Sequence, residues 1–581
     1  MFEIKDTFYL NGQPLQIRSG SIHYFRVVPE YWRDRLEKLV NMGCNTVETY
    51  IPWNFHEPQR GHFVWDGMHD VCRFLSIAQE LGLYIILRPS PYICAEWDLG
   101  GLPAWLLKEP GMRLRCLYKP YLDAVQAYYN ELLPRLLPYL ETHGGRVLMV
   151  QIENEYGSYG NDKAYLAALR DMLLRGGIDV PLFTSDGPTV PMVTSGTLPG
   201  IYAACNFGSR SQEQFRNMGT LLGRDTPKMC AEFWCGWFDY WGNGGHMHSD
   251  LAQNKVDLEA MLNEGHFNLY MFHGGTNFGF MSGANYYDKL TPDVTSYDYD
   301  SPLAEDGRPT EKYYAFREII ARHADIRTVP LSTDIRYRAL GQARLNRSVS
   351  LWNTLDKLAR PVCASVPLSM EELDQNYGYI LYRAALHEDG GIGELKLEGA
   401  NDRVNAYLNE KPLFTAYDLE LPVPKRFEPA AQGDRLDLLV ENMGRVNYGS
   451  KIENQRKGIT GGVQLNGHRH FGFEMYTLPL DAVQLNAIDW EGGCTDDAPT
   501  FREYVIDIEE PADTFVDFTG FGKGCLFING FNLGRFWEIG PQKRLYLPAP
   551  LLRKGRNTFI VFETEGKTAG ALSLCAEPDL G

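Results

Sequence analysis

Short apolar runs alternate with amphipathic stretches from the N-terminus to about residue 325. The runs are hydrophobic over nearly their whole length, which is typical of strands in a parallel sheet covered on both faces. Between the first two runs, apolar side chains recur at helical spacing from Trp32 to Val40, and Gly43 follows as a helix-ending glycine. The pattern predicts eight strands, at residues 17–24, 46–52, 84–88, 147–153, 182–185, 201–206, 228–233 and 268–273.

Eight strand–helix alternations predict a closed (β/α)8 barrel, the TIM barrel, rather than an open doubly wound sheet. A doubly wound nucleotide-binding fold would carry a glycine-rich phosphate loop after its first strand, and none follows residues 17–24. We therefore expect an α/β barrel domain over residues 1–325.

The pattern changes after about residue 325, where short alternating strands lie between Gly, Asn, Asp and Pro turns. A weak repeat divides this half, because residues 404–409 and 435–441 resemble residues 526–530 and 557–563. Each copy pairs a strand that ends in an Asn turn with a later alternating strand. The sequence thus predicts two all-β domains of the sandwich or jelly-roll type, at residues 326–475 and 476–581.

Charge and composition narrow the class of ligand. The 581 residues include 56 Lys and Arg against 74 Asp and Glu, for a formal net charge of −18. A negative field repels phosphate backbones and anionic lipids, so we expect no nucleic-acid partner. No run of about 18 uncharged apolar residues occurs, so we expect no membrane span. Aromatic residues make up 13% of the chain, which suits a packed core and also the stacking of sugar rings.

The cysteines and the first residues bear on the compartment. The 11 cysteines are odd in number and never form a CxxC pair, and the N-terminus shows no apolar signal segment. This usage indicates a reducing compartment without a disulfide framework or a structural zinc. We expect a cytoplasmic enzyme that needs no metal or other cofactor.

Two glutamates stand where a barrel places its chemistry, at the C-terminal ends of strands. Glu155 follows the fourth predicted strand and Glu232 closes the seventh, 232 − 155 = 77 residues later. Paired carboxylates at a barrel mouth match glycoside hydrolysis, in which a retaining enzyme holds them about 5–5.5 Å apart. A lone strand-end glutamate is more often a structural ion pair. Two of them, with Asn154 positioned to contact a sugar 2-OH, favour catalysis.

Several motifs in the same order resemble glycoside hydrolase family 35, whose members are β-galactosidases that retain the anomeric configuration. The resemblance covers the whole chain, strongly in the barrel and more weakly in the β-rich half, where it implies a galactose-binding-like second all-β domain. The motifs lie at residues 20–26 (GSIHYFR), 48–58 (ETYIPWNFHEP), 93–97 (ICAEW), 100–106 (GGLPAWL), 151–157 (QIENEYG) and 274–278 (GGTNF).

The resemblance implies a role for each site residue. Glu155 would be the acid/base and Glu232 the nucleophile, with the Tyr299 phenol holding Glu232 ionised and Tyr297 as the alternative. Glu153 would point the same way as Glu155, one layer deeper. Galactose contacts would come from Tyr50, Cys94, Ala95, Glu96, Asn154, Trp237, Tyr270 and Tyr299, and the candidate aglycone contacts are Trp234 and Tyr448.

Other reactive residue types have a plainer interpretation. His23, His56 and His273 lie near strand ends without metal-ligand spacing, so hydrogen-bonded structural roles are favoured. Cys94 and Cys235 lie near the predicted mouth without a partner base, which favours packing.

The leading hypothesis is an exo-acting retaining β-galactosidase that removes terminal β-D-galactose from oligosaccharides, with β1,3 linkages as one candidate. Two alternatives stay open: a β-glucosaminidase or β-glucosidase on the same scaffold, and a galactoside-binding protein without catalysis. The expected partner is a galactoside oligosaccharide, and family analogy suggests a homodimer.

Overall fold

The computed structural model describes residues 1–89, 91–223, 225–386, 391–494 and 497–581. Within these residues, eight parallel strands close into a barrel in the order β10-β11-β4-β5-β6-β7-β8-β9. All eight predicted strands are confirmed: β4 (Arg18–Ile22), β5 (Thr46–Tyr50), β6 (Tyr84–Arg88), β7 (Val147–Asn154), β8 (Leu182–Asp186), β9 (Tyr202–Phe207), β10 (Met229–Trp234) and β11 (His266–His273).

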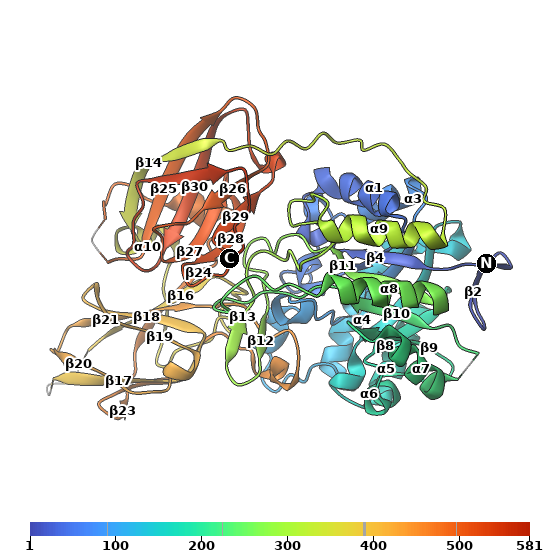
Figure 1. Ribbon diagram of the computed structural model, residues 1–581. Coiled ribbons are helices and arrows are strands. Elements are labelled where there is room, and N and C mark those ends of the chain that lie inside the picture. Colours follow the sequence, from blue (N-terminus) through green and yellow to red (C-terminus); the bar gives the residue numbers. More distant parts are fainter. Residues whose placement is uncertain (90, 224, 387–390, 495–496) are drawn as a thin grey trace.

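Helices surround the barrel on the outside (Figure 1). They bury the apolar faces that the sequence pattern indicates; in α1, Trp32, Leu36 and Leu39 are fully buried, and Gly43 ends the helix with φ 107°. The helices of this half are α1 (Trp32–Met42), α2 (Trp53–His56), α3 (Val71–Glu80), α4 (Lys119–Leu136), α5 (Lys163–Arg175), α6 (Val190–Gly196), α7 (Ser211–Leu222), α8 (Leu251–Glu264) and α9 (Glu311–His323).

A small N-terminal sheet covers the end of the barrel opposite the C-terminal ends of its strands. Its strands are β1 (Phe2–Ile4), β2 (Phe8–Leu10) and β3 (Gln13–Pro14). Phe2 and Phe8 form one apolar cluster with barrel residues such as Met149 and Phe183. The N-terminal sheet therefore covers the core at this end of the barrel.

The first all-β unit consists of two sheets packed face to face. One has the order β15-β24-β16-β21-β18-β19 and the other β20-β17-β22-β23. The six-stranded sheet contains β15 (Val362–Ala364), β24 (Phe473–Leu478), β16 (Tyr379–Ala385), β21 (Arg435–Glu441), β18 (Arg403–Leu408) and β19 (Lys411–Tyr417), and the four-stranded sheet contains β20 (Lys425–Ala430), β17 (Ile392–Asn401), β22 (Gly458–Leu465) and β23 (His468–Arg469).

The C-terminal unit is an eight-stranded sheet in the order β28-β27-β30-β25-β14-β31-β26-β29. It curls until its end strands β28 and β29 touch, and it encloses Val516, Leu526 and Phe559. Its strands are β14 (Gly341–Ser350), β25 (Thr500–Ile508), β26 (Thr514–Asp517), β27 (Lys523–Ile528), β28 (Phe531–Trp537), β29 (Arg544–Leu547), β30 (Gly555–Glu563) and β31 (Ala571–Cys575). Two short helices, α10 (Leu351–Leu358) and α11 (Ala482–Ala487), complete the fold.

The six-stranded sheet is the middle layer of the β-rich half. Along β16, Ile380 and Tyr382 pack against the four-stranded sheet, whereas Tyr379 and Leu381 pack against the C-terminal unit. Both faces are therefore buried, which explains why β16 has few polar residues at its centre.

The predicted repeat corresponds to two equivalent hairpins. The β18–β19 turn contains Asn409 with φ 48°, and the β27–β28 turn contains Asn529 with φ 50°. In each unit the first strand of the hairpin also pairs with the later strand of the repeat, β21 or β30.

The predicted domain limits at residues 325 and 475 stay predictions, but one strand pairing bears on them. The strand β14, which the division places in the domain at residues 326–475, pairs with β25 and β31 of the C-terminal sheet. The C-terminal unit therefore draws on two separate stretches of the chain.

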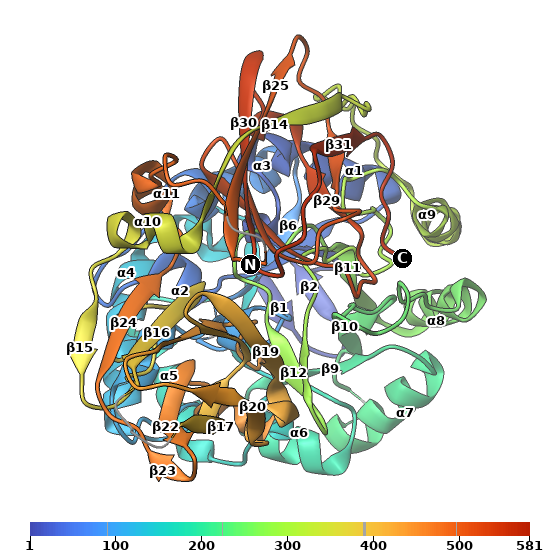
Figure 2. The ribbon, with the colours of Figure 1, turned by 90° about the vertical axis from the view of Figure 1, so that its left-hand side faces the viewer.

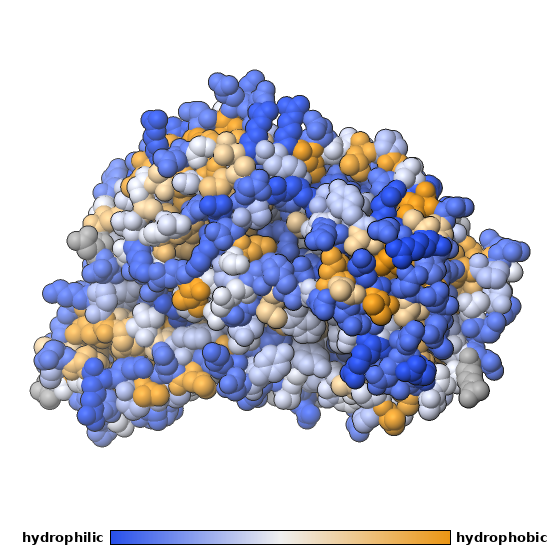
Figure 3. Space-filling view, in the orientation of Figure 1, coloured by the Kyte–Doolittle hydropathy of each residue, from blue (hydrophilic) through white to orange (hydrophobic). Residues whose placement is uncertain are grey.

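Both all-β units lie against the mouth side of the barrel (Figures 1 and 2). The face in Figure 3 is mainly hydrophilic, with apolar side chains only in small groups. No helix in the described ranges is long and apolar enough to cross a membrane.

Candidate active site

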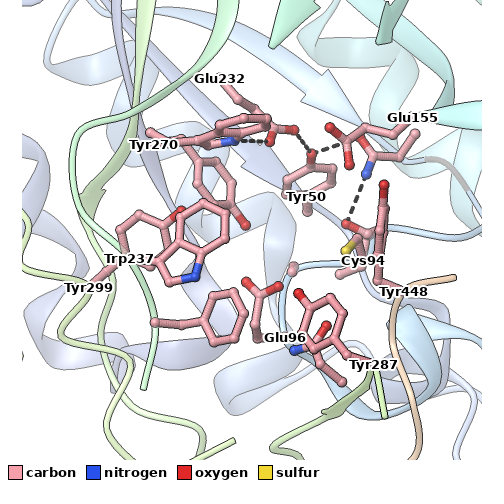
Figure 4. A pocket seen from close by; sticks show the side chains of 16 residues that line it. Tyr50, Cys94, Glu96, Glu155, Glu232, Trp237, Tyr270, Tyr287, Tyr299 and Tyr448 are labelled. Atoms are coloured by element: carbon pink, nitrogen blue, oxygen red, sulfur yellow. Dashed lines mark hydrogen bonds between the residues drawn. The ribbon is translucent and has the colours of Figure 1, made fainter. Parts of the chain in front are cut away.

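A cavity of about 170 Å³ opens at the C-terminal ends of the barrel strands (Figure 4). This is smaller than the ~300–1,000 Å³ typical of drug-sized ligands, so it suits one small ring. Twelve lining residues are those expected from the sequence: Tyr50, Cys94, Ala95, Glu96, Asn154, Glu155, Glu232, Trp234, Trp237, Tyr270, Tyr299 and Tyr448. Four were not predicted: Ile93, Phe238, Asn285 and Tyr287.

Glu232 lies in β10 and is almost completely buried. Its Oε1 accepts a hydrogen bond from the Tyr50 hydroxyl at 2.5 Å and lies 2.8 Å from Nη1 of Arg88. Its Oε2 accepts a hydrogen bond from Nε1 of Trp234 at 3.1 Å. Three donors therefore stabilise the negative charge of this carboxylate and fix its orientation.

Glu155 follows β7 and has a different environment. Its Oε1 accepts a hydrogen bond from Nδ2 of Asn206 at 3.0 Å. Burial, and secondly the negative charge of Glu232, raises the pKa of the Glu155 carboxyl to about 8. Glu155 therefore carries a proton at neutral pH, beside the Glu232 carboxylate, whose two oxygens contact three donors.

Both glutamates stand at irregularities in the barrel sheet. The register shifts between Gln151 and Asn154 in β7, and between Cys230 and Glu232 in β10. Glu155 itself has φ 47°, in the left-handed region that side chains other than glycine seldom adopt. Bulges and strained backbone of this kind turn a side chain away from the regular alternation and are frequent at active sites.

The expected direction of Glu153 is wrong. Its carboxylate forms a two-pronged ion pair with Arg115, at 2.8 and 3.0 Å, and accepts a hydrogen bond from the Tyr165 hydroxyl of α5. Glu153 thus faces the helix layer and not the cavity, because the register shift in β7 and the φ of Glu155 interrupt the alternation of side chains.

The expected role of Tyr299 in holding Glu232 stays a prediction. Among the described residues, the phenol that donates a hydrogen bond to Glu232 is that of Tyr50. Tyr297, the alternative, donates its hydroxyl hydrogen to Oε2 of Glu96 at 2.5 Å. Tyr299 lines the cavity with φ 64° and packs edge-on against Tyr270.

Glu96 lies in a tight left-handed turn. Cys94, Ala95 and Glu96 have φ values of 59°, 60° and 49°, so three consecutive residues adopt the strained region. Burial raises the pKa of the Glu96 carboxyl to about 7, although the hydrogen bond from Tyr297 opposes the shift. Nδ2 of Asn447, from the first all-β unit, lies 3.4 Å from Oε1 of Glu96.

The reactive side chains outside this pair match their plainer interpretation. His23 is fully buried and contacts Arg26, and its pKa lies well below the usual value because of burial and the charge of Arg26. Burial and the charges of Glu96 and Glu155 raise the pKa of the Cys94 thiol far above its usual value. No cluster of three potential metal-ligating side chains occurs in the described part of the chain.

Comparison with known protein families identifies the family to which the chain belongs. The model described as glycosyl hydrolases family 35 matches residues 7–323. The chain belongs to glycosyl hydrolase family 35. The models for a first all-beta domain and a galactose-binding domain of beta-galactosidases match residues 367–479 and 499–557.

Curated relatives of this family 35 enzyme match it over most of their length. It is 41% identical to "Beta-galactosidase-1-like protein 2" of Homo sapiens, over 99% of this chain and 91% of that protein. It is 41% identical to "Beta-galactosidase" of Xanthomonas manihotis, over 93% of this chain and 90% of that protein. It is 40% identical to "Beta-galactosidase" of Bos taurus, over 97% of this chain and 90% of that protein. The predicted family, the barrel with all-β domains and the glycoside hydrolase class are therefore confirmed.

Proposed function

We propose that this family 35 enzyme is a retaining exo-β-galactosidase, with Glu155 as acid/base and Glu232 as nucleophile. Its substrate is a terminal β-D-galactosyl residue of an oligosaccharide, and β1,3-linked galactosides are one class of it. The names of the curated relatives support the choice of galactose.

The observation that carries the proposal is the contrast between two carboxyl groups in one cavity. Glu155 has its pKa raised to about 8, while three donors stabilise the charge of Glu232. An enzyme that retains configuration needs one protonated and one ionised carboxyl group beside the scissile bond.

In the first step, an Oε atom of Glu232 attacks C1 of galactose. The bond from C1 to the leaving oxygen breaks, and that oxygen takes the proton of Glu155. The product is a galactosyl ester of Glu232 beside an ionised Glu155. The ester is neutral, so the charge that contributes to the high pKa of Glu155 is lost at this stage.

In the second step, Glu155 removes a proton from water, and the water oxygen attacks C1 from the face that the leaving group vacated. Glu232 departs as a carboxylate, which restores the original charges. Two inversions at C1 give β-galactose.

The shape of the cavity supports cleavage at a chain end. Its walls consist mainly of buried aromatic and polar side chains, and the N-terminal sheet closes the far end of the barrel. Glu96 is the buried carboxyl group that would accept hydrogen bonds from ring hydroxyls, including the axial 4-OH that distinguishes galactose from glucose.

Substitution of the two glutamates tests these roles. Glu232→Gln should reduce kcat by about four orders of magnitude or more, because an amide cannot form the ester. Glu155→Gln should still form the ester from an aryl galactoside with a good leaving group and then stall. Azide should rescue Glu155→Gln with a β-galactosyl azide product; an α product would reverse the assignment.

A panel of nitrophenyl glycosides tests the sugar. Galactoside should be cleaved at least tenfold faster than glucoside and N-acetylglucosaminide at equal concentration. A preference for either competitor would point to the glucosidase or glucosaminidase alternative, and binding without turnover of any glycoside would point to a binding protein.

A further inference from the structure

Three exposed aromatic rings surround the mouth of the cavity. Trp237, Tyr287 and Tyr448 are 40%, 72% and 37% exposed, and all three line the cavity. They come from the loop after β10, from a hairpin between β11 and α9, and from the segment that follows β21. The proposed mechanism gives Tyr287, the most exposed of the three, no role.

Tyr287 lies in the turn of a short hairpin, between β12 (Ala284–Tyr286) and β13 (Leu290–Pro292). Figure 4 shows its side chain next to Glu96, with the hydroxyl directed into the cavity. Partial burial, and then the negative charges of Glu96 and Asp293, raise the pKa of this phenol, in agreement with that placement. One face of the ring is therefore available at the mouth while its polar end reaches inward.

The hairpin is fixed from outside the barrel. The Leu290 amide donates to Oδ2 of Asp418 at 2.9 Å, and the Tyr417 hydroxyl donates to the Leu290 carbonyl at 2.5 Å. The Ala284 amide donates to the Arg445 carbonyl at 3.1 Å. Anchors from the first all-β unit thus hold Tyr287 in place before any ligand arrives, which lowers the entropy cost of binding.

We propose that Tyr287 contacts the substrate and helps determine its specificity, forming one wall of the subsite for the sugar that follows the terminal galactose. This inference rests on the proposed function. A sugar leaving the cavity passes the ring of Tyr287 on one side and those of Trp237 and Tyr448 on the others. The C–H face of that second sugar packs on the Tyr287 ring, while a glycoside with a small aglycone meets only the hydroxyl end of this side chain.

The test compares a galactosyl disaccharide with methyl β-galactoside, which lacks a second ring. Tyr287→Ala should raise KM for the disaccharide on the order of three- to tenfold, the equivalent of one aromatic contact. KM for methyl β-galactoside should rise by a smaller factor than KM for the disaccharide, because only the hydroxyl end of Tyr287 lies near the galactose. Tyr287→Phe, which retains the ring, should keep most of the disaccharide affinity.

Tyr314→Ala is the matched control, because Tyr314 is 62% exposed but lies on α9, on the outside of the barrel. Its KM values should equal those of wild type. If Tyr287→Ala behaves like this control, or raises KM equally for both galactosides, the assignment of the subsite is overturned. If the wild-type enzyme cleaves no galactoside, the proposed function falls first and this inference with it.

Discussion

The Arg88 guanidinium contacts side chains on three other barrel strands. It lies 3.1 Å from Oε2 of Glu48, 2.8 Å from Oε1 of Glu232 and 2.8 Å from Oδ1 of Asn154. Its charge offsets two buried carboxyl groups, and its planar set of donors fixes their directions, which a lysine could not do. Arg88 is thus a positioning residue for Glu232, the proposed nucleophile, and the Tyr50 ring centroid lies 4.3 Å from its guanidinium carbon.

In the proposed mechanism, the pKa of Glu155 sets the alkaline limit of activity. Below about pH 8 the carboxyl group is protonated and can donate to the leaving oxygen; above it the acid is lost. For a galactosyl disaccharide, kcat/KM should therefore fall about tenfold per pH unit above that value. The measurement is the pH profile of kcat/KM in wild type and in Glu155→Gln.

With an aryl galactoside of moderate leaving-group ability, wild type should keep this alkaline limb and Glu155→Gln should lack it. A limb that persists unchanged in the variant would assign it to another group, with Glu96 as the next candidate because its pKa is raised to about 7.

At the scale of elements, the ends of two barrel strands pack against the segment that carries Tyr297 and Tyr299. A Cβ atom on Gly236, after β10, would lie 1.7 Å from the Tyr299 carbonyl oxygen. A Cβ atom on Gly274, after β11, would lie 1.6 Å from the Tyr297 carbonyl oxygen. At both positions the neighbouring atom is a backbone carbonyl oxygen, which cannot move aside as a flexible side chain could. Only glycine, which lacks a Cβ atom, therefore fits there.

Gly236→Ala should therefore displace the segment that bears Tyr299. We expect a loss of about 1–3 kcal/mol in the free energy of unfolding and at least a tenfold lower kcat/KM. Gly245→Ala in the same loop is the control, because its Cβ would meet no atom within 4 Å. Equal stability and activity of the two variants would contradict the packing argument.

The elements differ in how far the sequence predicts them. The eight barrel strands were predictable because local apolar runs specify buried parallel strands, and Glu155 and Glu232 because strand ends converge. The direction of the Glu153 side chain could not be predicted, because the alternation of apolar and polar residues does not show where a bulge interrupts the strand. The role of Arg88 and the pairing of β14 depend on partners far along the chain, and the β12–β13 hairpin is too short to show a period.

At the scale of the whole molecule, Arg445 joins the barrel to the first all-β unit. Its Nη1 lies 3.0 Å from Oδ2 of Asp98, its Nη2 lies 2.7 Å from Oε1 of Glu371, and its side chain is fully buried. Asp98 follows the turn that carries Glu96, while Asn447 and Tyr448 follow Arg445 itself. The catalytic cavity is therefore completed by both halves of the chain.

Arg445→Met should leave two buried carboxylates without their partner. We expect a loss of about 3–5 kcal/mol in the free energy of unfolding, measured by denaturant titration, together with a higher KM for galactosides. Arg113→Met is the control, because Arg113 pairs with Glu453 across the same boundary at 3.4 Å but is 64% exposed. Its loss should stay below about 1 kcal/mol, and equal losses in both variants would contradict the argument.

The pairing of β14 has a consequence for synthesis on the ribosome. This strand ends at residue 350, and its first partner, β25, begins at residue 500, 500 − 350 = 150 residues later. On the ribosome, β14 therefore stays unpaired while the first all-β unit emerges and folds. Its sequence, with Arg344 and Arg347 among largely exposed positions, resists edge-to-edge association during that delay. The charged residues of β14, a strand that finally lies in the interior of a sheet, thus protect the nascent chain from aggregation.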